Sequence, residues 1–506
     1  MMPDIVIALR KIGIALLPAL IVAACTTVGP DYVEPAAPVQ PDWLEYDDPL
    51  LSKQPPLETG WWSDAYGDSV LDQLVETALE QNLSLRSAGL RVLQAHQQLA
   101  IAIGSQYPQQ QQLTGEAELF NTGGGTEQLY SLGFNLSWEA DVWGKFSRQV
   151  QSASAALDAS VASYDGVMLS MISQVAQNYL LIRTTQQQLL VAEYNLDLQK
   201  QSVVITTAKY DAGDTSELDV DQAQTLLYNT TASLAGLEIT LQQLKNSLAV
   251  LLGKPPQEMS DLLTEPEPVP KVKPQIAVGM PQDLIRRRPD LRAAERQLAA
   301  QSAQIGVAAA ELYPSFGIGG SIGTSVSTVR DQDFDDLFSS GTNAVNLFGF
   351  FQWNIFNYGR LKSNVRLQDA VFQQLLTDYR ESVLEAQAEV ENAIVAYLKS
   401  QQQLRAYRAA ADAAQRAADI SMLQYYDGQV DFNTVISTLR SLATQQEQLA
   451  AIQGTVATNL VEVYKSLGGG WQIRQGQDSL DLIPGETRDE MLERTRAWQK
   501  VFEQNG

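Results

Sequence analysis

The residues that could carry out chemistry are few, and they restrict the functions open to this chain of 506 residues. It contains one cysteine, Cys25, and one histidine, His96. A single cysteine can form neither an internal disulfide nor a cysteine-rich metal site. The GGSIG stretch at 319–323 matches a serine-hydrolase pattern, but it lies inside an alternating strand pattern, and His96 reads as an incidental helix residue. We therefore expect no catalytic residues, no metal site and no enzymatic activity.

The position of Cys25 indicates a modification instead. Arg10 and Lys11 precede an apolar run at 12–22, and small residues follow directly before Cys25. This order is typical of a secretory signal, and the run is shorter than the roughly 20 apolar residues of a membrane span. The four residues that end at Cys25 resemble a bacterial lipobox, so we expect a signal peptide at 1–24 and a covalent lipid on the thiol. An ordinary secretory signal with an unrelated cysteine is the alternative.

Composition excludes other classes of function. The formal net charge is −24 and no long basic run occurs, so nucleic acid is not an expected partner. Beyond the lipid, no cofactor is expected. No stretch after residue 25 is apolar enough for a membrane helix, so a membrane-spanning part would have to be built from strands.

The chain repeats itself. The pattern at 85–108 recurs at 291–314, an offset of 291 − 85 = 206, and the pattern at 138–253 recurs at 353–468, an offset of 353 − 138 = 215. Similarity held in register over such a length predicts two structurally equivalent halves. The offset grows once, by nine residues, which predicts an extra loop between the strands of the second half.

Proline-rich stretches mark the expected domain boundaries. The predicted organisation is a signal peptide at 1–24, a lipid-anchored, extended, proline-rich tether at 25–59, a first repeat at 60–254, a linker at 255–280, a second repeat at 281–471 and a C-terminal extension at 472–506. Within the extension, 485–502 reads as a charged helix with no assigned role.

Both halves show the same order of elements. Helices are expected at about 68–106 and 281–312, strands that include 130–139 and 315–326, long helices at about 145–211 and 360–426, and then returning helices of about 36 residues. The strand segments alternate apolar and polar residues, which gives each strand one apolar face. A long helix of this length would extend roughly 100 Å.

Four strands in one chain cannot close a barrel, because about eight are needed. An open sheet edge in lipid is not viable either. If these strands cross a membrane, several copies must share one barrel, and the residues by themselves leave two, three or four copies open.

Several motifs resemble one family. They are the segments at 60–82, 138–145, 210–227, 251–256, 288–316 and 353–361. Together they are similar to the TolC-like outer-membrane efflux factors, and most of all to the lipoprotein branch of NodT-like and OprM-like proteins. The resemblance implies a mixed α and β membrane protein: a homotrimer with a 12-stranded outer-membrane β-barrel, continued by a 12-helix α-barrel through the periplasm of a Gram-negative bacterium.

The same resemblance implies a function. A channel of this family passively conducts solutes that an inner-membrane pump delivers through a periplasmic membrane-fusion adaptor, and its barrel contacts outer-membrane lipid. An elongated periplasmic scaffold lipoprotein without a pore is the main alternative, and a lipoprotein enzyme is a more distant one. Tyr130 and Trp138 stand where interfacial aromatic residues stand in membrane strands, which favours the pore.

The turns at Gly213 and Gly428 would form the periplasmic tip in this family, where a gate is expected. Acidic residues cluster near both turns: Asp211, Asp214, Glu217, Asp219, Asp221, Asp427 and Asp431. Helix capping and gating are both open for Asp214 and Asp431. Where relatives often carry an aspartate nine residues after the second glycine, this chain has Ser437, with Thr434 nearby, whereas Arg440 matches the family. We expect a cation-preferring pore whose closure is held by contacts between the paired turns, with Arg440 as a candidate partner for a carboxylate.

Overall fold

The computed structural model describes residues 27–55, 57, 59–121, 123, 125–259, 263–273 and 275–503. The signal peptide and Cys25 lie outside these residues, so lipidation stays a prediction. The chain forms two compact units, and each takes segments from both halves of the sequence. The first, here the strand unit, comprises the described residues up to Ala36, Arg91–Val161 and Ala293–Arg380. The second, here the tip unit, comprises Ala37–Leu90, Ala162–Arg292 and the described residues from Glu381 onward.

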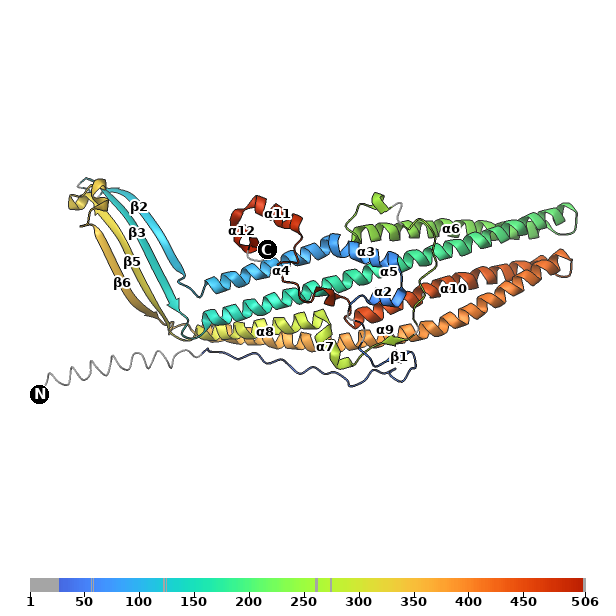
Figure 1. Ribbon diagram of the computed structural model, residues 1–506, viewed down its shortest axis with the longest axis horizontal. Coiled ribbons are helices and arrows are strands. Elements are labelled where there is room, and N and C mark those ends of the chain that lie inside the picture. Colours follow the sequence, from blue (N-terminus) through green and yellow to red (C-terminus); the bar gives the residue numbers. More distant parts are fainter. Residues whose placement is uncertain are drawn as a thin grey trace. The chain divides into compact units, whose positions relative to one another are not determined.

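The strand unit contains a four-stranded antiparallel sheet in the order β2-β3-β5-β6 (Figure 1). The strands are β2 (Gln110–Asn121), β3 (Thr126–Ala140), β5 (Ser315–Ser327) and β6 (Asn343–Gln352). The two hairpins are neighbours because β3 pairs with β5. As a result, β2 and β6 are the two outer strands of the sheet.

The register gives the sheet one apolar and one polar face, as the alternation predicts. In β3, Phe134 pairs with Leu113 on one side and with Ile322 on the other, and Ile322 pairs with Val345. These four side chains therefore share what we call the apolar face. Further members are Leu119, Leu132, Leu136, Trp138, Phe316, Ile318, Leu347 and Phe351. Many of them are exposed in the single chain, and the opposite, polar face carries mainly Gln, Glu, Asn, Ser and Gly.

The extra loop predicted in the second half lies between β5 and β6. It contains two short 3₁₀ helices, η3 (Thr328–Arg330) and η4 (Phe334–Phe338). Phe334 contacts Tyr130 edge to face, with ring centroids 5.1 Å apart. The loop thus folds back on the apolar face at the end of the sheet that is farther from the long helices.

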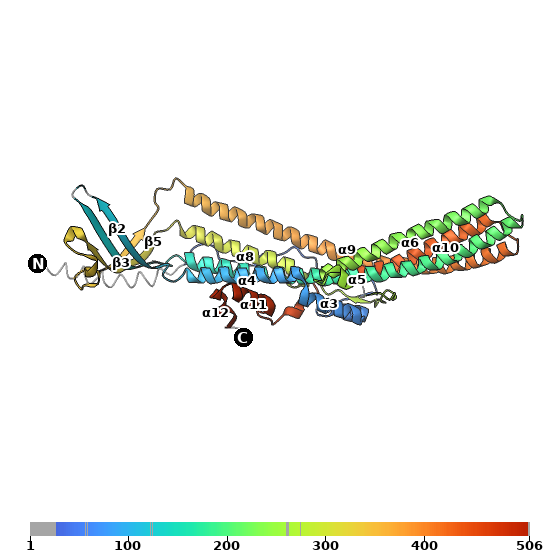
Figure 2. The ribbon, with the colours of Figure 1, turned by 90° about the horizontal axis from the view of Figure 1, so that it is seen from above.

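The long helices have the predicted bounds. α5 (Lys145–Asp211) and α9 (Arg360–Tyr426) each contain 67 residues. The returning helices α6 (Glu217–Leu251) and α10 (Phe432–Ser466) each contain 35. Figures 1 and 2 show α6 lying along α5 and α10 lying along α9. Among the described residues, no helix has both the length and the apolar composition that a membrane crossing requires.

The first helix of each half is not continuous, so that prediction was wrong. In the first half, α2 (Trp61–Tyr66) and α3 (Ser69–Gln81) precede α4 (Leu83–Gly104). The break falls at Asn82, whose side-chain oxygen accepts a hydrogen bond from the Leu85 backbone N–H (2.8 Å), and this interaction starts a new helix.

The second half breaks at the equivalent place. There, η2 (Pro281–Asp283) and α7 (Leu284–Arg287) precede α8 (Pro289–Ala310). Arg288 has an extended backbone with ψ 119°. The ring of a following proline excludes the helical conformation at the residue before it, so α7 must end at Arg287.

In both halves of the sequence, an equivalent tryptophan forms a hydrogen bond across the junction between helix and strand. The indole N–H of Trp138 donates to the Gln106 carbonyl (3.2 Å), and that of Trp353 donates to the Leu312 carbonyl (3.0 Å). The spacings are 353 − 138 = 215 and 312 − 106 = 206, the two offsets found in the sequence. Trp143 adds a stacking contact with Tyr313, with centroids 4.7 Å apart.

The predicted tether is described from Thr27 onward: residues 27–40 form no helix or strand, residues 44–50 form turns, and the segment packs on the protein. In the strand unit, Arg148 forms an ion pair with Asp31 at 2.8 Å. In the tip unit, Trp43 is buried and donates to the Gly279 carbonyl (3.1 Å). The short strand β1 (Leu51–Ser52) then pairs in parallel with β4 (Ile276–Ala277) of the inter-repeat linker, which also holds η1 (Pro256–Met259).

The C-terminal extension is part of the tip unit and packs against its other segments. Its elements are η5 (Trp471–Arg474), α11 (Gly485–Arg494), η6 (Arg496–Trp498) and α12 (Gln499–Glu503). The expected single helix at 485–502 is therefore broken, with Thr495 in an extended conformation. Asp165 of α5, fully buried, forms ion pairs with Arg474 and with Arg292 (3.3 Å). These ion pairs fix the start of the extension to the long helix.

Candidate functional site at the helix tip

The two turns of the tip unit have the same backbone geometry. After α5, Gly213 has φ 78° and the Asp214 N–H donates to the Lys209 carbonyl (2.8 Å). After α9, Gly428 has φ 70° and the Gln429 N–H donates to the Gln424 carbonyl (2.8 Å). This hydrogen bond, with glycine in the left-handed conformation, ends a helix and lets the chain reverse.

The second turn rests on a hydrophobic cluster. Tyr425, Phe432, Val435 and Leu439 are each at most 5% exposed. The Tyr425 and Phe432 rings lie 5.5 Å apart. Further members of the cluster are Ala223, Leu226, Ala414, Ala418, Ile436 and Leu442. Because α6, α9 and α10 all contribute to the cluster, the second turn is held by packing.

Asp431 caps the helix that follows the second turn. Its carboxylate accepts hydrogen bonds from the backbone N–H and from the hydroxyl of Thr434, both at 3.0 Å. Ser437 lies on the next turn of the helix and donates its hydroxyl to the Thr434 carbonyl (2.9 Å). The capping role considered for Asp431 is thus present in the structure. Both the backbone N–H and the hydroxyl of Thr434 take part in it as donors.

The first turn is held more weakly. Ser216 is the N-cap residue of α6, but its side chain makes no capping hydrogen bond. Thr215 donates its hydroxyl to the Asp219 carboxylate. Asp211 and Asp214 are exposed, and so is Asp427 at the second turn. Within the described chain, the carboxylates of these three exposed residues have no ion-pair partner.

One cation connects the two turns. The Lys209 ammonium group donates to the Tyr425 carbonyl (3.1 Å) and lies 4.7 Å from the centre of the Tyr425 ring. Burial raises the pKa of the Tyr425 hydroxyl above its ordinary value. Lys209 thus tethers the end of α5 to the end of α9 through one hydrogen bond and one cation–π contact.

Sequence reasoning identified the carboxylates at the tip but missed Lys209. Arg440, the expected cationic partner, is exposed on α10, and no carboxylate of the described residues lies within ion-pair distance of it. A lysine four residues before the turn glycine was the available signal for Lys209. Its contact joins residues 216 positions apart, which no local pattern reveals.

Comparison with known proteins gives a consistent picture. The family model described as "Outer membrane efflux protein" matches residues 74–254 and 280–469. Nodulation protein T of Rhizobium leguminosarum bv. viciae is 30% identical over 462 residues, covering 91% of this chain and 94% of that protein. The pyoverdine export outer membrane protein OpmQ of Pseudomonas putida is 32% identical over 473 residues, covering 91% and 97%.

Solved structures share the fold. The structure of the outer-membrane channel OprN matches with a TM-score of 0.82 at 30% sequence identity. The match covers 88% of this chain and 99% of that one. The similarity therefore extends over both units and over nearly the whole length of a known channel protomer.

Proposed function

The chain belongs to the outer membrane efflux protein family and is an outer-membrane channel of a tripartite efflux system, and we propose that three copies of it assemble to form that channel. Each copy contributes four strands to one barrel, which gives 3 × 4 = 12 strands. Four long helical segments per copy continue the barrel as a 12-helix tube. The pore conducts solutes passively, and an inner-membrane pump supplies the energy.

The observation that carries the proposal is the pair of outer strands. Within the described part of the chain, the backbone of β2 is paired with β3 alone, and that of β6 with β5 alone. Both strands continue the apolar face, with Leu113 and Leu119 on one edge and Val345 and Leu347 on the other. An apolar face with open edges requires pairing with another copy, because unpaired backbone groups are not tolerated in lipid.

The junction residues support the same arrangement. Inside one copy, Trp143 stacks on Tyr313 where the first half meets the second. The equivalent residues, Tyr358 (143 + 215) and Tyr107 (313 − 206), lie at the two outer edges, and they are 104% and 65% exposed. In a closed ring, the second half of one copy meets the first half of the next, so Tyr358 would contact Tyr107 there as Trp143 contacts Tyr313.

Engineered disulfides test the ring and count its members. Ser137 pairs with Gly319 on the polar face inside the chain. On the outer strands, Gln352 (137 + 215) and Thr114 lie on the same face; Thr114 is one residue beyond the position that the offset of 206 gives (319 − 206 = 113), because Leu113 lies on the apolar face. The Gln352→Cys/Thr114→Cys variant should yield dimers and trimers on non-reducing gels and nothing larger. Thr114→Cys alone is the matched control and should stay monomeric under denaturing conditions. A ladder beyond three copies, or no species above two, would contradict the trimer.

We further propose that Cys25 carries a lipid that anchors the chain and takes no part in the pore. A sequence that resembles a lipobox supports this, and the segment that follows it packs at Asp31 in the strand unit and at Trp43 in the tip unit. Mass spectrometry of the mature N-terminus should find Cys25 as the first residue with acyl chains. An unmodified thiol there would overturn the proposal.

The partners are a periplasmic adaptor and an inner-membrane pump, as the named roles of the relatives in export suggest. Affinity purification of the native protein from mildly cross-linked membranes should recover both partners together. Recovery of the pump without any adaptor would argue against a tripartite arrangement. Planar bilayer recordings of the purified protein separate this function from the scaffold alternative, because a scaffold gives no conductance.

A further inference from the structure

In the half of the sheet nearest the long helices, two aromatic side chains break the pattern of the polar face. That face is otherwise built there from Gln110, Gln112, Thr114, Asn135, Ser137, Glu139, Gly317, Gly319 and Ser321. Phe348 and Phe350 of β6 lie on the same face, because they pair with Gly319 and Gly317. We call these two residues the aromatic pair.

The aromatic pair forms one surface over the neighbouring strand. A Cβ atom at Gly319 would overlap the ring of Phe348, and a Cβ atom at Gly317 would overlap the ring of Phe350. The rings thus lie over β5, away from the open edge of β6. Their centroids are 6.3 Å apart and Phe348 is 48% exposed. If another strand paired with the edge of β6, the ring faces that point away from β5 would still be uncovered.

The charges on the same face have one sign. The four strands contain four charged residues, which are all glutamates: Glu116, Glu118, Glu127 and Glu139. The register places each of them on the polar face. The face therefore attracts cations and repels anions, and its low-dielectric surroundings strengthen the effect.

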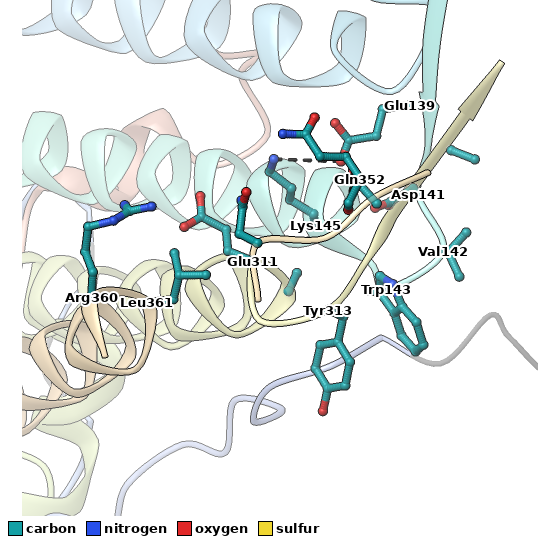
Figure 3. A pocket seen from close by; sticks show the side chains of 14 residues that line it. Glu139, Asp141, Val142, Trp143, Lys145, Glu311, Tyr313, Gln352, Arg360 and Leu361 are labelled. Carbon is teal, nitrogen blue, oxygen red and sulfur yellow. Dashed lines mark hydrogen bonds and ion pairs between the residues drawn. The ribbon is translucent and has the colours of Figure 1, made fainter. Parts of the chain in front are cut away.

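A polar pocket adjoins the aromatic pair (Figure 3). It has a volume of about 280 Å³ and lies where the strands meet α5, α8 and α9. Glu139 lines it and forms an ion pair with Lys145 at 3.8 Å, and Gln352 and Glu311 point into it from other elements. Glu139 pairs with Gly317, over which Phe350 lies, so the carboxylate and the ring belong to one row of the sheet.

We propose that the aromatic pair and the glutamates of the polar face form a contact site for transported aromatic organic cations. The inference rests on the proposed function, since the polar face must line a pore for solutes to reach it. A ring face attracts a cation and stacks on another aromatic ring. Glu139 lies in the row of Phe350, while Glu116, Glu118 and Glu127 add negative charge in the other half of the same face. Three copies would place six rings and twelve carboxylates around one passage, from two rings and four glutamates each.

The competing explanation is structural. Aromatic residues that lie over glycines on a neighbouring strand help to fix strand register. If this were the sole role of Phe348 and Phe350, their replacement would change the stability of the barrel and leave solute contacts as they were. The experiment must therefore measure solute residence and stability separately.

The test uses the full-length channel in planar bilayers, with ethidium as the aromatic cation and tetraethylammonium as the cation without rings. Ethidium should produce transient current blockades with longer dwell times than tetraethylammonium. Phe348→Leu/Phe350→Leu keeps apolar bulk over the glycines, and it should shorten the ethidium dwell time about three- to tenfold. Phe351→Leu, on the apolar face of the same strand, is the matched control and should leave the dwell time unchanged.

The outcomes are separable. Glu116→Gln/Glu118→Gln should shorten the dwell times of both cations, because charge acts on each. Equal dwell times for ethidium and tetraethylammonium in the unmodified channel would overturn the proposal, and that comparison needs no variant. An unchanged ethidium dwell time in the double leucine variant, with a lowered melting temperature, would assign the rings to strand register. Absence of any conductance would contradict the proposed function itself.

Discussion

The turn at Gly213 and the turn at Gly428 share one backbone geometry but are stabilised by different interactions. The second turn is capped by Asp431 and rests on buried Tyr425 and Phe432. At the first turn, Ser216 makes no side-chain capping bond, and Glu217 stands at the position equivalent to Phe432 (432 − 215 = 217). Equivalent positions therefore have a structural role at the second turn and an exposed one at the first.

This difference divides the tip into a fixed part and a part held by few contacts. Local stability depends on buried apolar contacts, and segments with few of them open at low free-energy cost. The end of α5 contacts the end of α9 through Lys209, which donates to the Tyr425 carbonyl, and α5 also packs Val203 and Ile205 against the hydrophobic cluster of the second turn. A gate that must open repeatedly is expected to have its movable segment at the first turn and its support at the second.

The largest effect is expected from Phe432→Ala. Phe432 is 2% exposed, and removal of a buried phenylalanine side chain costs about 3 kcal/mol because it leaves a cavity. Hydrogen exchange of peptides covering 425–440 should accelerate strongly. Glu217→Ala is the matched variant at the first turn and should change exchange little. Equal acceleration in the two variants would contradict the division into a fixed and a movable part.

Lys209→Met should have the next largest effect. The substitution keeps the aliphatic stem but removes a hydrogen bond from a charged donor, at a cost of about 1.5 kcal/mol. The first turn should then separate more readily from the second, which raises single-channel conductance and increases hydrogen exchange at 205–216. Lys200→Met is the control, because Lys200 forms an exposed ion pair with Asp197 on the same helix (3.1 Å). A channel as closed as the unmodified one would show that Lys209 does not restrain the tip.

Asp431→Ala should have a smaller effect. The variant loses the cap on α10, which costs about 1 kcal/mol. Ser216→Ala, at the equivalent position of the first turn (431 − 215 = 216), should cost close to nothing, since Ser216 makes no capping bond. Hydrogen exchange over the first turn of α10 and the first turn of α6 compares the two directly. A larger acceleration of exchange in Ser216→Ala than in Asp431→Ala would mean that the first turn, and not the second, is the fixed one.

Much of this architecture follows from the sequence. Two offsets and the turn glycines are enough to place α5 and α9 at the observed bounds, because long amphipathic runs and left-handed glycines are local signals. Alternation likewise predicts the two faces of the sheet. The break at Asn82 was missed because a single capping residue inside a helical pattern gives a weak signal.

The contacts at the tip could not be predicted in the same way. The Lys209 contact joins segments 216 residues apart. Its acceptor is a backbone carbonyl, which every residue has, so the sequence pattern does not indicate the partner. Asp214 and Asp431 look alike in sequence, yet Asp431 alone of the two forms a cap. The gating role expected for Thr434, Ser437 and Arg440 stays a prediction, because it depends on where neighbouring copies place their own turns.

The smallest effect is expected from Asp214→Asn. Asp214 is exposed at the first turn and makes no side-chain hydrogen bond within the described chain, so folding stability should change little. Three copies would lose three carboxylates at the mouth of the tube, which lowers the local attraction for cations. Reversal potentials in asymmetric KCl should shift slightly toward zero, and the shift should shrink as salt rises, because the screening length falls to about 3 Å at 1 M. Asp197→Asn, on the flank of α5 away from the turn, is the matched control and should not shift the potential. An equal shift in both variants would mean that selectivity reflects net charge rather than the carboxylates of the movable turn.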